Sequence, residues 1–153
     1  MIEKALAQKV LHEALRTGAD LAEIYVEDVV SLQLRLDDSR LEQAVRGADR
    51  GAGVRVFFGN LVTYAFTDQL DEASLMNAAR AAASAGNQSS KTQVIDLTER
   101  KSPLHYPVEK PFESMSVAEK ARLLGRMDEA ARAVGPQIVQ VTAGYLELQR
   151  HMW

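Results

Sequence analysis

Residues 46–68 read RGADRGAGVRVFFGNLVTYAFTD, and this stretch decides which fold the chain can adopt. Two runs rich in β-branched and aromatic residues, 54–58 and 61–66, are separated only by Gly59 and Asn60. Such a two-residue spacer is typical of a tight β-hairpin, because glycine reaches the backbone conformations that the turn requires. The glycines between residues 47 and 51 predict a further turn before the first run. The stretch therefore predicts antiparallel strands joined by short turns.

The same glycines need to be tested against a phosphate-binding loop. A dinucleotide-binding loop has the spacing G-x-G-x-x-G between a strand and a helix, so that the pyrophosphate meets the helix N-terminus. Gly51 and Gly53 begin this spacing, but Val56 stands at the third glycine position and a strand follows. The Gly-Lys-Ser/Thr signature of a P-loop does not occur in the chain. We therefore interpret Gly51, Gly53 and Gly59 as hinges of an antiparallel sheet.

Helices and further strands are expected on both sides of this stretch. An amphipathic helix is predicted at about residues 2–17 and an alanine-rich helix at about 71–85, each followed by a glycine. A third helix begins at Ser116, which forms a capping box with Glu119, and it ends at a Gly-Pro pair. Its apolar residues are spaced for one buried face, at positions 117, 121, 124, 127, 131 and 134. Strands are expected at residues 22–26, 30–36, 41–46, 54–58 and 61–66, with a sixth from residue 138.

The predicted fold is α+β, with a mainly antiparallel sheet of five to six strands and helices packed on one face. The pattern leaves open the strand order and whether the last strand joins the same sheet. We expect a single domain with three parts. Residues 1–86 form a helix, strands and a helix, residues 87–115 a proline-rich linker or flap, and residues 116–153 a helix and a strand.

Composition and charge exclude several classes of protein. The formal net charge of -3 gives no reason to expect binding of nucleic acid, and the sequence shows no basic cluster. The chain has no cysteine, which excludes disulfides, thiolate nucleophiles and cysteine metal sites. The first residues do not follow the pattern of a signal peptide, and no run approaches the ~20 apolar residues of a membrane span. We expect a cytoplasmic protein without membrane contact.

The sequence assigns no catalytic residue and no metal ligand. His12 and Glu13 begin a pattern known from zinc peptidase helices, but Arg16 stands where the second histidine is needed. The other two histidines lie far away, at positions 105 and 151. The serines lack the G-x-S-x-G context of a nucleophile. The acidic pairs stand at element ends, where caps and solvated turns explain them, although an acid/base site assembled in space stays open.

Two binding candidates remain, Arg55 and Tyr64. Arg55 alternates with Val54 and Val56, so it lies on the exposed face of its strand or pairs with an acidic partner. Tyr64, across the hairpin, is a core aromatic, an edge contact or part of a cleft. An exposed edge of the sheet would bind an extended peptide by adding a strand, or would be covered by a partner domain.

Beyond these local patterns, residues 49–85, DRGAGVRVFFGNLVTYAFTDQLDEASLMNAARAAASA, resemble the N-terminal domain of the TldD/PmbA family. The shared features are a glycine turn, a Gly-Val-Arg-Val strand, a hairpin, an aromatic-Ala-aromatic strand and an alanine-rich helix. The segments on both sides agree with this resemblance. The helix and strand after residue 115 look more like the TldD branch than its sister. Proteins of this family are described as zinc metallopeptidases and as modulators of DNA gyrase.

The resemblance implies that this chain is a non-catalytic N-terminal domain. The family's metal site is similar to an H-E-x-x-x-D/H motif on a helix, with a further cysteine or histidine downstream, and this sequence has no such motif. Zinc is therefore expected in a catalytic C-terminal domain that is absent here, and no cofactor is expected in this chain. The apolar ending, VTAGYLELQRHMW, is then interpreted as that of a piece of a longer protein.

The resemblance also implies partners. In the family, the N-terminal domain is understood to pack on the catalytic domain and to help form a dimer around a peptide-cleaving chamber. The expected partners are the chain's own C-terminal domain, a sister TldD/PmbA subunit in a homo- or heterodimer, and unfolded or modified peptides. Two alternatives stay open. One is a stand-alone peptide- or protein-binding adaptor that uses a sheet edge, and the other is a small metal-free hydrolase.

Overall fold

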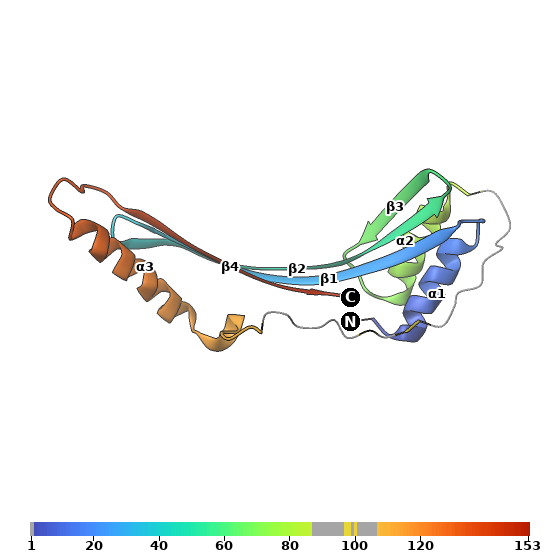
Figure 1. Cartoon of the computed structure of the whole chain (residues 1–153), viewed down its shortest axis with the longest axis horizontal. Coiled ribbons are helices and arrows are strands. Elements are labelled where there is room, and N and C mark those ends of the chain that lie inside the picture. The colour runs from blue at the N-terminus through green and yellow to red at the C-terminus, as the bar shows by residue number, and fades with distance from the viewer. Residues whose placement is uncertain (1, 87–96, 99, 101–106) are drawn as a thin grey trace. The chain divides into compact units, whose positions relative to one another are not determined.

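The computed structural model describes residues 2–86, 97–98, 100 and 107–153 (Figure 1). Four strands form one sheet in the order β3-β2-β1-β4. The predicted α+β class with an antiparallel sheet is confirmed. The elements in chain order are α1 (Lys4–Leu15), β1 (Leu21–Asp37), β2 (Arg40–Phe58), β3 (Leu61–Thr67), α2 (Glu72–Ala83), the 3₁₀ helix η1 (Phe112–Ser114), α3 (Val117–Arg132) and β4 (Thr142–Met152).

The predicted number of five to six strands is not confirmed, because runs expected as separate strands are continuous. The first two predicted strands together form β1, and the next two form β2. The glycines between residues 47 and 51 therefore lie inside a strand and not in a turn. A Cβ atom at Gly47 would lie 2.8 Å from the Ser31 hydroxyl oxygen, and one at Gly51 would lie 3.0 Å from the Thr67 carbonyl oxygen. Close cross-strand neighbours thus favour glycine here without any turn.

Two tight turns connect β1 to β2 and β2 to β3, and the second is at the Gly59-Asn60 pair that the sequence predicts. Asp38 and Ser39 have φ of 46° and 66°, which is the conformation of a hairpin turn that matches the twist of its strands. Gly59, with φ of 58°, begins the turn between β2 and β3. That turn fixes the register, in which Phe58 lies opposite Leu61. The last strand joins the same sheet beside β1, but it starts at Thr142 and not at residue 138.

Contacts divide the chain into two compact units. Unit 1 comprises Met1–Asp28, Arg50–Ser102 and His151–Trp153, and unit 2 comprises Val29–Asp49 and Pro103–Arg150. The predicted proline-rich linker, residues 87–115, lies mostly outside the described residues. Its last part contains η1. None of the helices among the described residues is long and apolar enough to cross a membrane.

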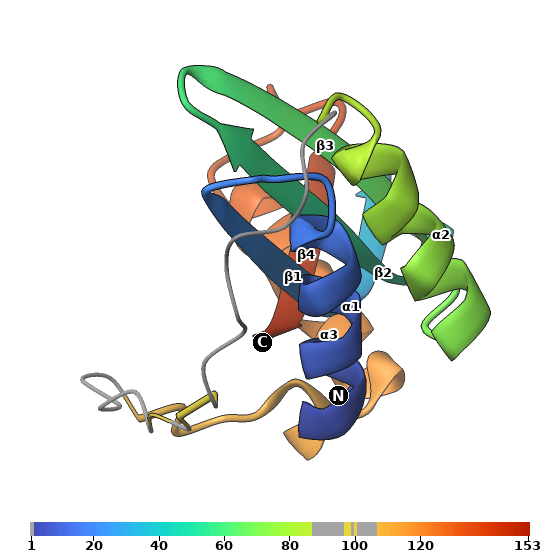
Figure 2. The same cartoon turned by 90° about the vertical axis from the view of Figure 1, so that its right-hand side faces the viewer.

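In unit 1, α1 and α2 lie side by side over the same face of the sheet (Figure 2). The alanines of α2 are small, so its backbone can approach the sheet closely. Ion pairs from Lys9 to Glu72 and from Arg80 to Glu13 connect the two helices at 3.0 and 3.3 Å. The side chains of this core with 0% exposure are Val10, Ala14, Val54, Val56, Leu75 and Ala79.

In unit 2, α3 buries only part of the face that the sequence predicts, since Leu124 is buried and Ala121 packs against the core. Its buried residues are Lys120, Leu124 and Asp128, spaced four apart, so the row facing the core has a charged group at each end. Val117 and Met127, which were expected inside, are 44% and 55% exposed. The apolar spacing alone was therefore misleading. The core of unit 2 consists of Leu32, Leu34, Leu36, Phe112, Leu124 and Ala143.

Carboxylates cap the N-termini of α2 and α3. Asp71 accepts hydrogen bonds from the backbone N–H of Ser74 at 3.0 Å and from its hydroxyl at 2.8 Å. These bonds lower the pKa of Asp71, the backbone N–H more than the hydroxyl. The predicted capping box at Ser116 is confirmed, and the Ser116 hydroxyl and then its backbone N–H lower the pKa of Glu119. Both caps are therefore stronger with the carboxyl group ionised.

We expect acid to weaken both helix caps. Since the folded-state pKa of each carboxyl lies below its unfolded value of about 4, the stabilisation is fully present above that value. It is lost as the pH falls through the folded-state pKa. Urea unfolding measured from neutral to acidic pH checks this. The Asp71→Asn variant keeps an acceptor oxygen at the cap but does not titrate, so its stability should fall less in acid. Equal acid sensitivity of the variant and the parent would contradict the role of Asp71.

Candidate functional site

The two binding candidates from the sequence, Arg55 and Tyr64, lie directly opposite each other in the β2–β3 hairpin. Arg55 is exposed between Val54 and Val56, which are both buried in the core of unit 1. Its guanidinium forms an ion pair with Glu23 of β1 at 3.1 Å, and both side chains are about half exposed. Arg55 therefore lies on the exposed face and also has an acidic partner. The two alternatives drawn from the sequence, an exposed position and an acidic partner, are thus both true of Arg55.

Tyr64 is exposed and does not belong to the core. Its exposed fraction is 59%, and its ring stacks on Phe66 with 6.3 Å between the ring centroids and 23° between the planes. The ring leans over Gly53, where a Cβ atom would lie 2.4 Å from the tyrosine hydroxyl oxygen. Gly53 therefore lies within β2 and leaves room for the Tyr64 ring. The interpretation of Gly53 as a hinge is wrong. Of the three glycines taken as hinges, only Gly59 lies in a turn.

We call the side chains of Val62, Tyr64 and Phe66 the β3 outer face. Their exposed fractions are 49%, 59% and 77%, so this strand presents a continuous apolar strip. Of these three residues, only Tyr64 was predicted from the sequence as a binding candidate. The alternation of side chains along a strand places residues 62, 64 and 66 on one side and would have identified Phe66 as well. The strip can contact another polypeptide, whereas its charged neighbour, Arg55, is already paired with Glu23.

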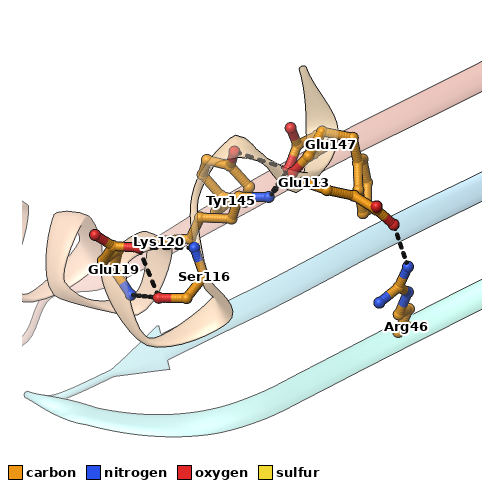
Figure 3. Close-up of polar contacts among 8 residues, drawn as sticks. Arg46, Glu113, Ser116, Glu119, Lys120, Tyr145 and Glu147 are labelled. Carbon is orange, nitrogen blue, oxygen red and sulfur yellow. Dashed lines mark hydrogen bonds and ion pairs between the residues drawn. The ribbon is translucent and has the colours of Figure 1, made fainter. Parts of the chain in front are cut away.

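Unit 2 contains a buried charged network around Lys120 (Figure 3). The Lys120 side chain is 3% exposed, and its Nζ forms an ion pair with Glu147 of β4 at 2.6 Å. The same Nζ donates a hydrogen bond to the Phe112 carbonyl at 2.5 Å and lies 4.5 Å from the centroid of the Phe112 ring. Lys120 thereby connects η1, α3 and β4. This role of Lys120 could not be predicted from the sequence, because a lysine on an amphipathic helix is normally solvated.

The surroundings of Lys120 indicate a structural role. Tyr145 donates a hydrogen bond to Glu147 at 3.1 Å, and burial, followed by this carboxylate, raises the pKa of the tyrosine. Arg46 also lies over the Phe112 ring, 5.6 Å from its centroid. The cavity beside this cluster measures about 180 Å³, which is below the ~300 Å³ of small ligand sites. The network therefore holds elements together, and nothing in it faces a substrate-sized space.

The acidic pair Asp37-Asp38 is occupied by local hydrogen bonds. Asp37 accepts from Gln140 at 3.1 Å and from Thr142 at 2.9 Å, and these two bonds, in that order, lower its pKa. Asp38 forms an ion pair with Arg132 of α3. A carboxyl group with a lowered pKa stays ionised near neutral pH, so it is unsuited to act as a general acid. This pair supports the turn between β1 and β2 and gives no support to a hydrolase site.

The described residues offer no donor set for a metal ion. Within residues 2–86, 97–98, 100 and 107–153, no three His, Cys, Asp or Glu side chains gather closely enough to hold one. His12 is exposed on α1. Glu13, beside it, forms ion pairs with Arg16 at 3.2 Å and with Arg80 at 3.3 Å, so it connects α1 to α2.

Comparison with known sequences finds similarity to proteins that carry metallopeptidase names. Residues 22–86 match the model of PmbA/TldA metallopeptidase domain 1. The chain is 29% identical over 131 residues to a Metalloprotease TldD homolog of Haemophilus influenzae, covering 81% of this chain and 26% of that protein. It is 23% identical over 124 residues to a Metalloprotease TldD homolog of Buchnera aphidicola from Schizaphis graminum, with the same shares covered. The chain thus spans about a quarter of the length of these curated relatives.

Solved structures show the same fold. A candidate modulator of DNA gyrase from Bacteroides thetaiotaomicron superposes with a TM-score of 0.70 at 16% identity, covering 97% of this chain and 36% of that one. TldE from Thermococcus kodakarensis superposes with a TM-score of 0.64 at 15% identity, covering 98% and 34% of the two chains. These names agree with the family that residues 49–85 resemble.

Proposed function

We propose that this chain carries the N-terminal domain of the TldD/PmbA metallopeptidase family and is a non-catalytic domain of a TldD-like zinc metallopeptidase. In this role it contributes to the assembly of the peptidase and to the access of unfolded or modified peptides to the catalytic chamber. Its proposed partners are a C-terminal catalytic domain, a TldD- or TldE-type sister subunit and the peptides themselves. The proposed location is the cytoplasm.

One observation carries the proposal. The family model matches residues 22–86, which include the whole hairpin with Arg55 and Tyr64, and this hairpin presents an exposed apolar strip. An apolar strip on a domain that normally belongs to a larger protein is suited to contact with another polypeptide. The net charge of -3 argues against nucleic acid as the partner.

Zinc has no place among the described residues. Since they gather no three suitable donors, we assign no step of peptide cleavage to this chain. The proposal places the catalytic zinc in the part of the relatives that this chain does not span. The contribution of this chain is then binding and positioning, not bond cleavage.

We expect the purified chain to hold no stoichiometric zinc and to cleave no peptide. Zinc is added, the chain is dialysed, and the bound metal is then measured by atomic absorption. Cleavage is followed with an unfolded casein substrate. One tightly held zinc per chain, or cleavage that a chelator abolishes, would overturn the non-catalytic assignment.

The assembly role has a separate test. The chain is mixed with the region of the Haemophilus influenzae TldD homolog beyond the quarter that it matches, and complex formation is measured by size-exclusion chromatography with light scattering. We expect a complex. A region that is folded by circular dichroism and still forms no complex with the chain would contradict the assembly role.

A stand-alone peptide- or protein-binding adaptor is a second candidate function. The β3 outer face favours it, because binding through a strand edge needs no catalytic domain. The gene decides between the two candidates. A reading frame that continues past Trp153 into a helix with a His-Glu metal motif supports the peptidase domain, and a stop codon there supports the adaptor.

A further inference from the structure

The outer edge of β3 presents backbone hydrogen-bonding groups from three alternate residues. The two-residue turn makes Phe58 and Leu61 a hydrogen-bonded pair, and in an antiparallel ladder such pairs alternate with pairs that point outward. The Asp20 N–H donates to the Phe57 carbonyl at 2.8 Å, so the backbone of Phe57 faces away from β3. Its partner Val62 therefore directs its own N–H and C=O to the outer edge. Tyr64 and Phe66, two and four residues further on, do the same.

The same three residues carry the exposed side chains of the β3 outer face. Within the described part of the chain, no strand pairs with this edge, because β3 is the last strand in the sheet order. The strand sequence LVTYAFT contains no charged residue and no proline, which are the usual means of protecting an edge from pairing. Unprotected backbone groups and exposed apolar side chains thus coincide on one strand.

We propose that the outer edge of β3 binds an extended peptide segment as an added antiparallel strand. The segment has apolar or aromatic residues at alternate positions, which lie against Tyr64 and Phe66. It also has a basic residue near its N-terminus, because that end of an antiparallel strand meets the exposed Asp68 just after β3. The inference names the peptide-binding element of the proposed function and rests on that function for the source of the peptide.

An extended peptide suits this edge better than a second copy of the chain. The strand is seven residues long, and three of its residues point outward. It therefore offers a narrow strip, whereas a stable protein–protein interface buries about 1,200 Å² or more. A peptide can pair with the outward N–H and C=O groups of β3 through its backbone alone. Pairing with a second copy is a distinct outcome of the experiment.

The first test uses the blocked peptide Lys-Val-Thr-Val-Thr-Val-Thr with a fluorescent label, and binding to the full chain is followed by anisotropy. Two further versions carry N-methyl groups on alternate residues, so each version lacks the N–H donors on one side of the backbone. We expect saturable binding of the parent peptide. One methylated version should bind at least about tenfold more weakly, while the other binds nearly as well as the parent. Equal affinities of the two versions, or no binding of the parent, would overturn backbone pairing at this edge.

Variants of the chain locate the site. Val62→Pro removes an outward N–H without removing a bond to β2, and Phe66→Lys places a charge on the strip while leaving the backbone intact. Each is expected to weaken binding about tenfold or more. Leu146→Lys is the matched control, since Leu146 is a 73% exposed residue of β4 at the opposite edge. Circular dichroism checks that each variant folds. If Val62→Pro does not fold, Phe66→Lys alone tests whether the peptide binds at β3. A loss with Leu146→Lys but not with Phe66→Lys would place the site elsewhere.

Hydrogen exchange of the amides of Val62, Tyr64 and Phe66 completes the test. We expect fast exchange in the peptide-free chain and slower exchange with the peptide bound. Slow exchange that depends on protein concentration would identify a second copy as the occupant, and slow exchange at all concentrations would show an edge covered by the chain itself. Either result overturns the proposal. A chain that binds no peptide but still forms the complex with the TldD region refutes this inference and leaves the assembly role standing.

Discussion

Replacing Lys120 with methionine is expected to lower the free energy of unfolding by about 3 kcal/mol. Methionine fills a similar volume but leaves Glu147 without its cation and the Phe112 carbonyl without its donor. Because Lys120 is 3% exposed and the Glu147 side chain is 22% exposed, water replaces these interactions only in part. Urea unfolding followed by circular dichroism measures the loss.

Two controls separate the network from the general effect of removing a charge. Lys110→Met makes the same change at an exposed position, so its stability should stay within about 0.5 kcal/mol of the parent. Adding Glu147→Gln to the Lys120 variant should recover part of the loss, because the unpaired carboxylate causes much of it. If Lys120→Met unfolds like Lys110→Met, the buried network contributes nothing to stability.

Leu75→Ala is expected to destabilise the chain by a similar amount, about 3 kcal/mol. Leu75 is completely buried on α2, in the cluster that contains Val54 and Val56 of β2. Shortening it removes apolar contacts and leaves a cavity that the surrounding side chains fill only in part. For a chain of this size, such a loss corresponds to a fall in the midpoint of thermal unfolding of roughly 6–12 °C. Differential scanning calorimetry provides the measurement.

The matched control for this core variant is Leu146→Ala. Leu146 is 73% exposed, so the same truncation should change stability by less than about 1 kcal/mol. Equal losses at positions 75 and 146 would contradict the core that the structure shows. Because Leu75 belongs to unit 1 and Lys120 to unit 2, hydrogen exchange in the two variants also reports whether the units unfold together.

Features that depend on neighbours in the sequence could be predicted, and those that depend on distant residues could not. The hairpin at Gly59 and the capping box at Ser116 follow from local backbone geometry and are confirmed. The long strand β2 could not be recognised, because its glycines look like a turn. Glycine is favoured at these positions because a side chain or the backbone of a neighbouring strand lies close, as Ser31 does beside Gly47.

The same distinction applies to the candidate site. The alternation around Arg55 predicts its exposed face, but its partner Glu23 lies on another strand and carries no signal in the sequence. Lys120 was overlooked because its partners, Glu147 and the Phe112 carbonyl, come from β4 and η1. Phe66 could have been found from the same alternation that identified Tyr64. The binding roles of Arg55 and Tyr64 stay predictions.

The division of the chain into interleaved units limits how it can be cut for expression. Unit 1 consists of three separate segments and unit 2 of two, so no single cleavage yields either one intact. A fragment matching the family model, residues 22–86, would lose α1, which supplies Val10 and Ala14 to the first core. The same fragment would contain the hairpin at Asp38-Ser39 but would lack its core partners Phe112, Leu124 and Ala143. Domain swaps and fusion proteins built from this chain should therefore keep both units on one polypeptide.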